Sequence, residues 1–388
     1  MIRPGMIFFT VLCVVLLSVI FFIQRMLPSL FADRQRGRHF CRKLLLIDGL
    51  LVAALVAGHF LPVPDTVAGP ALLGFTMAFM FQLLLGFFIF LSRLGRWCYR
   101  KLAAEPLDPS RRRLLTHAAA YPLAAAAAAA YGGLEERTDQ VVREQRIGIA
   151  GQNTGLDGFR LVQLSDIHLG LFFSLSMLKK LLEQASDLGG TALVITGDLF
   201  DDDAMNAEAA EIVDSYRQRF PAGIWFCYGN HEYFRDIGKT KAALAKTHIH
   251  VLLNNNACVV DGKKPLYFAG ADYPHDRAKF DALAKSMTDE ALQGIPSHAM
   301  TVLLAHHPDF IDQGAAHGVS LVLTGHTHGG QLGLFGIPLV PPVFKYMRGL
   351  YRVKDTLGYV HSGNGSWFPY RFGCPPEIAC FTLREEIE

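Results

Sequence analysis

The chain has 388 residues, which is long enough for two domains or for one domain and a membrane region. Hydrophobic residues make up 51% of it and the mean hydropathy is +0.24, which argues against an ordinary, wholly soluble protein. The formal net charge is +2, but residues 132–388 hold 23 Lys and Arg against 30 Asp and Glu, a net charge of −7. This acidic balance argues against a nucleic-acid partner.

Four apolar segments occupy the first third of the chain, over about residues 6–23, 44–61, 70–91 and 114–131. A helix needs roughly 20 mostly apolar residues to cross a bilayer. No small-residue cleavage site follows the first segment, which argues against a signal peptide. The fourth is rich in alanine and contains Pro122, so its apolar character is the weakest. We therefore predict a multi-pass transmembrane region over residues 1–131.

The charges between these segments predict an orientation. Residues 24–43 hold six basic side chains against one acidic one, residues 92–113 hold seven against two, and residues 62–69 hold no basic one. Because Lys and Arg concentrate on the cytoplasmic side, both basic loops should be cytoplasmic. The chain after the fourth segment should then lie on the extracytoplasmic side of the inner (cell) membrane.

Residues 132–158 are polar and contain glycines, and we interpret them as a linker with one strand near residues 141–149. Beyond them, short apolar runs alternate with helical periodicities, such as the apolar face of a helix predicted near residues 176–188. Alternating strands and helices predict an α/β domain over residues 159–388.

Five of the predicted strands end in side chains that can bind a metal. These ends read Asp166-Ile-His168, Gly197-Asp198, Gly229-Asn230-His231, Ala305-His306-His307 and Gly325-His326-Thr327-His328. In α/β sheets, ligands gather beyond the carboxyl ends of the strands. One histidine in such a place is usually structural, but five strand ends with nitrogen and oxygen ligands are improbable as an accident of packing.

The chemistry of these side chains predicts a metal centre. A set of Asp, Asn and His without cysteine suits Mn²⁺, Fe or Zn²⁺ and is unlike a structural zinc site. The ligands are too many for one ion, so we predict two divalent ions about 3.5–4 Å apart that share one carboxylate. Such a pair clamps an in-line displacement at phosphorus and lowers the pKa of a bridging water.

The series DIH, GDLFD, GNHE, AHHP and GHTHGGQ resembles the calcineurin-like metallophosphoesterase superfamily from about Phe159 to Leu383. The stretch GNGSWFPYRFGCPPEIACFTL, residues 363–383, resembles the close of its membrane-anchored or exported bacterial phosphodiesterase branch. The resemblance implies a four-layer α-β-β-α sandwich, which here would follow a bundle of about four transmembrane helices.

The same resemblance implies roles for single residues. His231 would face the phosphate and stabilise or protonate the leaving oxygen, and Asp201 would orient His231. The implied metal ligands are Asp166, His168 and His328 for one ion, Asn230, His306 and His326 for the other, and Asp198 as the bridge.

Other histidines and arginines need separate interpretations. Alternation along a strand lets only one of His306 and His307 reach the metals, and the family pattern selects His306. The histidines that match no ligand position are expected at the surface: His275, His317 and His361. The arginines that could meet a second phosphate are Arg348, Arg352 and Arg371.

Together these observations predict an integral membrane hydrolase of phosphomono- or phosphodiesters, with an envelope or lipid-linked substrate and a metal-bridging hydroxide as nucleophile. The apolar residues 332–351 could receive a lipid. Two alternatives stay open. One is a pyrophosphatase of the UDP-2,3-diacylglucosamine type on the cytoplasmic face, and the other is a metal-binding envelope protein without catalytic activity.

Overall fold

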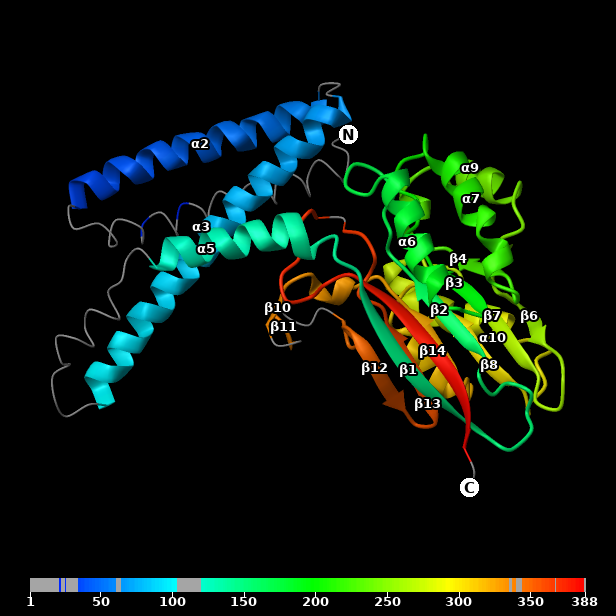
Figure 1. Cartoon of the computed structure of the whole chain (residues 1–388). Helices are drawn as coiled ribbons and strands as arrows, with labels where there is room; N and C mark the ends of the chain where they lie inside the picture. The colour runs from blue at the N-terminus through cyan, green and yellow to red at the C-terminus, as the bar shows by residue number, and fades with distance from the viewer. Residues whose placement is uncertain are drawn as a thin grey trace. The chain divides into compact units, whose positions relative to one another are not determined.

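The computed structural model describes residues 34–60, 64–102, 120–334, 337–339, 344–366 and 368–386, together with Phe21 and Arg25 (Figure 1). The chain divides into two compact units, Met1–Glu135 and Glu136–Glu388. The first unit contains the apolar segments, and the second contains all five strand ends that carry potential metal ligands.

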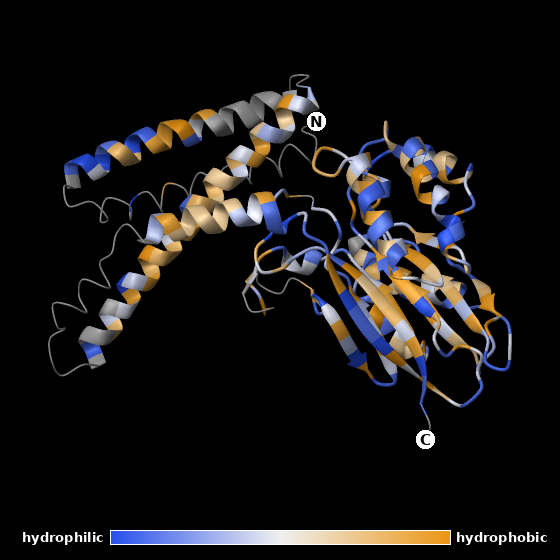
Figure 2. Ribbon diagram, viewed as in Figure 1, coloured by the Kyte–Doolittle hydropathy of each residue, from blue (hydrophilic) through white to orange (hydrophobic). Residues whose placement is uncertain are grey.

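The described part of the first unit is helical, with α2 at Arg34–Phe60, α3 at Asp65–Leu102 and α5 at Ala120–Ala130. Hydrophobic residues are frequent along these helices (Figure 2). Among the described residues, Thr66–Gly95 in α3 is the one stretch long and apolar enough to cross a membrane, and it contains the predicted span 70–91. The predicted span 6–23 lies almost wholly outside the described residues, as does the first part of 114–131. The predicted bundle of four spans is therefore not confirmed.

A buried polar contact joins two of these helices. Asp48, within the predicted span 44–61 of α2, is only 2% exposed and accepts a hydrogen bond of 2.8 Å from Gln82 Nε2 of α3. A buried carboxylate needs such a partner, because leaving it unpaired costs several kcal/mol.

The second unit contains two six-stranded sheets, in the orders β1-β14-β2-β3-β4-β5 and β12-β13-β9-β8-β7-β6. The strands of the first sheet are β1 Val141–Ala150, β2 Arg160–Leu164, β3 Ala192–Thr196, β4 Ile224–Cys227, β5 His250–Val251 and β14 Glu377–Glu386. Those of the second are β6 Asn255–Val260, β7 Leu266–Gly270, β8 Met300–Leu304, β9 Leu321–Thr324, β12 Gly349–Val353 and β13 Thr356–Val360. A separate pair is formed by β10 Gly333–Leu334 and β11 Ile337–Pro338.

Helices connect many of these strands. The α-helices are α6 Leu175–Asp187, α7 Asn206–Ser215, α8 Asn230–Phe234, α9 Ile237–Leu244, α10 Phe280–Ala291 and α11 Phe310–Ala316. Short 3₁₀ turns occur at Arg217–Arg219, Arg277–Lys279 and His328–Gly330, and a π-helical turn at Tyr131–Glu136 leads from one unit into the other.

Three buried hydrophobic clusters separate four layers in the second unit. The middle cluster lies between the sheets and includes Leu161 and Val194 from the first sheet and Phe268 and Leu323 from the second. α6, α7 and α9 pack against the outer face of the first sheet, and α10 and α11 pack against the outer face of the second. The order of layers is therefore helix, sheet, sheet, helix.

α6 follows directly from its local sequence. Ser174 caps its N-terminus by accepting a hydrogen bond from the Met177 N–H. Leu178, Leu181 and Leu182 recur at helical spacing and are at most 2% exposed. Burying each of these side chains contributes roughly 1.5–3 kcal/mol, so the apolar face holds the helix on the sheet.

The segment interpreted as a linker, residues 132–158, contains the strand predicted near residues 141–149, and this strand, β1, belongs to the first sheet. β1 pairs in parallel with β14 from Val141–Glu377 to Ala150–Glu386. Ile147 and Ile149 are buried in the cluster between the sheets. The strand is polar because most of its side chains are exposed or half-buried. Its pairing with β14 shows that the second unit begins before residue 159.

Candidate metal centre

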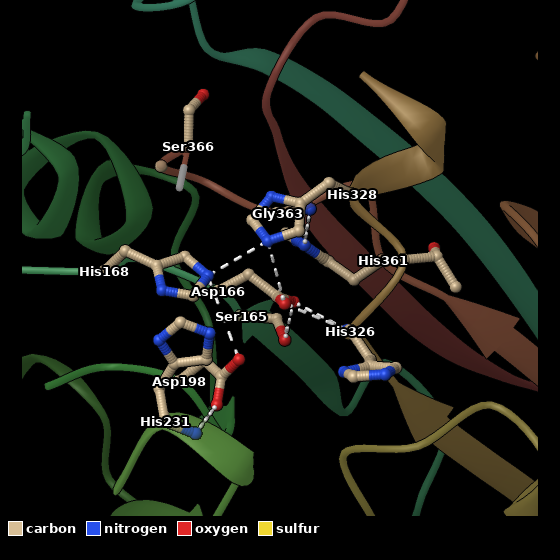
Figure 3. Close-up of polar contacts among 12 residues, drawn as sticks. Ser165, Asp166, His168, Asp198, His231, His326, His328, His361, Gly363 and Ser366 are labelled. Atoms are coloured by element: carbon tan, nitrogen blue, oxygen red, sulfur yellow. Dashed lines mark hydrogen bonds and ion pairs between the residues drawn. The ribbon is translucent and has the colours of Figure 1, made fainter. Parts of the chain in front are cut away.

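The parallel strands bring their carboxyl ends to one edge of the sandwich. β2, β3 and β4 are parallel neighbours in the first sheet, as are β7, β8 and β9 in the second. β2 is followed by Asp166, β3 by Asp198 and β4 by Asn230. β8 is followed by the pair His306-His307, and β9 by the pair His326-His328. The loops from both sheets meet there, as Figure 3 shows for many of these side chains.

One group of potential ligands joins Asp166, His168 and His328. His328 Nε2 lies 3.0 Å from His168 Nε2 and 3.4 Å from Asp166 Oδ1 (Figure 3). All three residues are at most 3% exposed. The ligand atoms of this group all lie within 4.8 Å of one another, which fits one ion.

A second group joins His306, His326 and Asp198. His306 Nε2 lies 3.1 Å from His326 Nδ1 and also 3.1 Å from Asp198 Oδ2. The same Asp198 oxygen lies 3.8 Å from His168 Nε2 of the first group. The carboxylate of Asp198 is thus within reach of both groups.

Asn230 offers an oxygen atom that could bind a cation. The residue is 6% exposed, and its Oδ1 atom is buried with no hydrogen-bond partner among the residues that the structure describes. A buried amide oxygen without a partner is costly, and a cation at this position would satisfy it. The residues present therefore fit a site for divalent cations.

The backbone is unusual at the candidate ligands themselves. Five of them have a positive φ, between 50° and 72°, which non-glycine residues seldom adopt: Asp166, His168, Asp198, His326 and His328. Such conformations concentrate at functional sites, where the surrounding structure holds them. Glycines give the loops room, since a Cβ on Gly229 would lie 2.2 Å from Asp198 Oδ1 and one on Gly325 2.2 Å from Asp166 Oδ2.

Glu232 connects two of the ligand loops. Its fully buried carboxylate accepts backbone hydrogen bonds of 2.8–3.1 Å from Gly229, Asp198, Leu199 and Phe200. A buried N–H without an acceptor costs about 1–3 kcal/mol, so this carboxylate stabilises the loop of the shared Asp198. The sequence motif GNHE contains Glu232, but no local pattern indicated this role.

His231 and Asp201 lie beside the ligands. His231 Nδ1 is 2.5 Å from Asp201 Oδ1, and the other Asp201 oxygen is 3.1 Å from His168 Nδ1. The His231 side chain is 23% exposed, whereas those of His168 and Asp198 are at most 2% exposed, so His231 is open to an incoming molecule. His231 also forms a possible ligand group with His168 and Asp198, so proximity alone does not separate an acid from a ligand.

The carboxylates and histidines of the site shift one another's pKa values. Burial opposes the charged form of His306, but Asp198 and Asp166 outweigh it and raise its pKa to about 10. Burial also opposes ionisation of Asp198, yet His306 and neighbouring histidines hold its pKa well below the usual range. For His326 and His328, burial and nearby positive charge lower the pKa, which favours the neutral imidazole that a metal requires.

Two expectations about the remaining residues are wrong. His361 is fully buried rather than at the surface, and its Nδ1 accepts a hydrogen bond from the Gly363 N–H. Arg371 is also fully buried, so it cannot meet a phosphate; its guanidinium is used by main-chain carbonyls such as that of Ser362. His275 and His317 are exposed, as predicted.

Two aromatic side chains lie beside His326: Tyr273, which the sequence did not indicate, and Phe344, from the apolar residues 332–351. Tyr273 follows β7, and its ring centroid lies 6.0 Å from those of both His306 and His326. The ring centroid of His326 lies 5.1 Å from that of Phe344 and 5.0 Å from that of His307. The only signal for Tyr273 in the sequence was its position directly after the strand PLYFAGAD. An aromatic residue in that position does not indicate a metal site.

Comparisons with known proteins agree with this geometry. The family model described as calcineurin-like phosphoesterase matches residues 159–330. A Danio rerio protein named "Transmembrane protein with metallophosphoesterase domain" is 32% identical over 355 residues, covering 87% of this chain and 79% of that protein. Because this alignment is longer than the second unit, it also includes part of the apolar N-terminal region.

Two bacterial relatives match over a shorter length. The uncharacterized metallophosphoesterase YkuE of Bacillus subtilis strain 168 is 30% identical over 238 residues, covering 59% of this chain and 80% of that protein. An uncharacterized metallophosphoesterase of Helicobacter pylori strain J99 is 31% identical over 227 residues, covering 58% of this chain and 59% of that protein.

Proposed function

Because this chain belongs to the calcineurin-like phosphoesterase family, we propose that it is a membrane-associated hydrolase of phosphoric esters with a dinuclear metal centre. The observation that carries the proposal is the position of Asp198 between the two ligand groups, 3.1 Å from His306 Nε2 and 3.8 Å from His168 Nε2. The apolar stretch Thr66–Gly95 and the relative named as a transmembrane protein indicate the membrane association.

In this proposal the ligands divide between two ions of Mn, Fe or Zn. Two divalent ions supply a hydroxide nucleophile at neutral pH and neutralise the charge that develops on the phosphoryl oxygens. The set for one ion is Asp166, His168 and His328, the set for the other is Asn230, His306 and His326, and Asp198 is shared.

His231 is the proposed general acid. Its Nδ1 faces Asp201, which leaves Nε2 to give a proton to the leaving oxygen of the ester. Burial opposes the protonated form of His231, but Asp201 and Asp198 outweigh it and raise its pKa, so the proton to be donated is held more firmly than in a free histidine. Asp201 orients the ring by this contact.

The proposed substrate is a phosphomono- or phosphodiester, with an envelope or lipid-linked ester as the natural candidate. Two observations support an apolar substituent on the phosphorus: the aromatic rings of Tyr273 and Phe344 lie beside His326, and the chain has a membrane-spanning candidate helix. The orientation proposed from the loop charges places this site on the extracytoplasmic side.

The protein should bind two divalent ions per chain. Chelation should abolish hydrolysis of simple phosphoesters, and Mn²⁺ or a similar ion should restore it, because neither ligand group alone activates a water and clamps the phosphate. Metal analysis of the purified full-length chain, before and after chelation, measures this. One ion or none under saturating conditions would contradict the dinuclear centre.

A reporter fused after residue 135 should lie outside the cytoplasm, because the two basic loops keep the helix ends that they join on the cytoplasmic side of the membrane. An alkaline phosphatase fusion there should be active and a green fluorescent protein fusion dark, with the reverse pattern for fusions after residue 100. Activity only in the cytoplasm at residue 135 would contradict the orientation and favour the nucleotide-linked lipid alternative.

A further inference from the structure

The loop between β13 and β14 packs directly behind the first group of ligands. A Cβ on Gly363, which has a φ of +80°, would lie 3.0 Å from His328 Nδ1 and 3.1 Å from Asp166 Cβ. A Cβ on Gly365 would lie 1.9 Å from the Ile167 carbonyl oxygen. The loop therefore has no free space between itself and the segment Asp166–His168, so a shift of the loop would move the ligands.

Arg371 gives this loop its shape. Its buried guanidinium donates from Nη2 to the carbonyls of Ser362 and Gly365 at 2.8 and 2.6 Å, and from Nη1 to the Cys374 carbonyl at 3.0 Å. The same Nη2 lies 3.3 Å from His328 Nδ1. Since a buried charge requires this many partners, the loop and the His328 ring share one fixed arrangement.

Asn364 connects the loop to Asp166, a second ligand of the group. Its Oδ1 accepts from the Ser165 N–H at 2.9 Å, and its own N–H donates to the Ser165 carbonyl at 2.8 Å. Ser165 Oγ in turn donates to Asp166 Oδ2 at 2.6 Å (Figure 3). The position of the Asp166 carboxylate therefore depends on Asn364.

Two residues at the start of the second unit hold this loop. Glu136, only 5% exposed, accepts a hydrogen bond of 3.0 Å from the Gly373 N–H, between Arg371 and Cys374. Gln140 Nε2 donates to the Asn364 carbonyl at 2.7 Å, and Gln140 Oε1 accepts from Asn364 Nδ2 at 3.1 Å. Both belong to the segment by which the chain passes from the apolar unit into the second unit.

We propose that Glu136 and Gln140 are positioning residues for the metal site of Asp166, His168 and His328. Glu136 acts on His328 through Gly373 and the loop that Arg371 shapes, and Gln140 acts on Asp166 through Asn364 and Ser165. The affinity of this one site then depends on the segment that leaves the membrane-associated unit, while the site of Asn230, His306 and His326 does not. The inference rests on the two-ion centre proposed above.

The test is a Mn²⁺ titration of the full-length protein in detergent. Calorimetry measures the affinity of each ion, and electron paramagnetic resonance shows whether the bound ions are coupled. Wild type should bind two ions and show the spectrum of a coupled pair. Glu136→Ala and Gln140→Ala should each weaken one ion by roughly 10-fold, at the low end for outer contacts of a metal site, and show uncoupled Mn²⁺ at intermediate concentrations. His328→Ala, which removes a ligand of the affected site, identifies the spectrum of the ion that remains.

Two matched variants separate positioning from general loosening. Glu136→Gln keeps an acceptor oxygen for Gly373 and should bind both ions as wild type does. Asp139→Ala removes an exposed carboxylate from the same segment and should change nothing. Gln140 is partly exposed, so Gln140→Ala tests the proposal even if Glu136→Ala fails to fold.

The outcomes are distinct. Wild-type affinity in both alanine variants, or equal weakening of both ions, would overturn the inference while leaving the dinuclear centre standing. Binding of one ion or none by the wild-type protein would instead overturn the proposed function.

Discussion

Replacing Asp198 with alanine should remove both ions and abolish turnover. Asp198 Oδ2 is within reach of His306 and His168, one from each ligand group, and Oδ1 accepts a hydrogen bond of 2.8 Å from the backbone N–H of His231. Loss of an outer contact typically costs 10–100-fold in metal affinity, so loss of a shared ligand should cost about 100-fold or more at each site. Turnover should fall by at least the roughly 10²–10⁴-fold expected for loss of a general acid.

Metal content and phosphoesterase rates of the full-length protein measure this effect. Asp198→Asn keeps the shape of the side chain and separates its negative charge from its volume. Asp355→Ala, at an exposed position between β12 and β13, is the control for a lost carboxylate and should match wild type. Two ions bound with normal affinity in Asp198→Ala would show that this carboxylate does not bridge them.

Replacing His231 with alanine should keep both ions but reduce turnover by roughly 10²–10⁴-fold. The side chain is partly exposed beside the buried ligands and is held by Asp201 at 2.5 Å, an arrangement suited to proton transfer. The loss should be largest for alkyl esters, whose poor leaving groups need the proton most. Nitrophenyl esters, whose leaving groups depart without help, should be affected less.

The comparison of alkyl and nitrophenyl esters, together with metal analysis, tests the role of His231. His317→Ala, which removes an exposed histidine bonded to Asp289, is the matched control and should leave the rates unchanged. If His231→Ala lost an ion, His231 would be a ligand together with His168 and Asp198, a grouping that their positions allow. Near-normal rates on alkyl esters would exclude it as the acid.

The sequence by itself determined the elements whose signals are local. α6 was predictable because Leu178, Leu181 and Leu182 repeat at helical spacing, and this spacing alone creates an apolar face. The strand ends that carry the candidate ligands were predictable because a buried strand must be apolar, so a polar residue directly after it marks the strand's end. Parallel neighbours then place such ends at one edge, as found for Asp166 and Asp198.

Only the tertiary structure decided the features that depend on partners far along the chain. The strand near residues 141–149 was predicted, but it was assigned to a linker, since its pairing with β14 joins residues more than two hundred positions apart. Arg371 and His361 looked exposed because their residue types usually are, and they are buried here because carbonyls and N–H groups of a folded loop satisfy them. Local sequence patterns indicate only how often a residue type is exposed to solvent. Which distant group forms a hydrogen bond with a buried charge is determined when the chain packs into its tertiary structure.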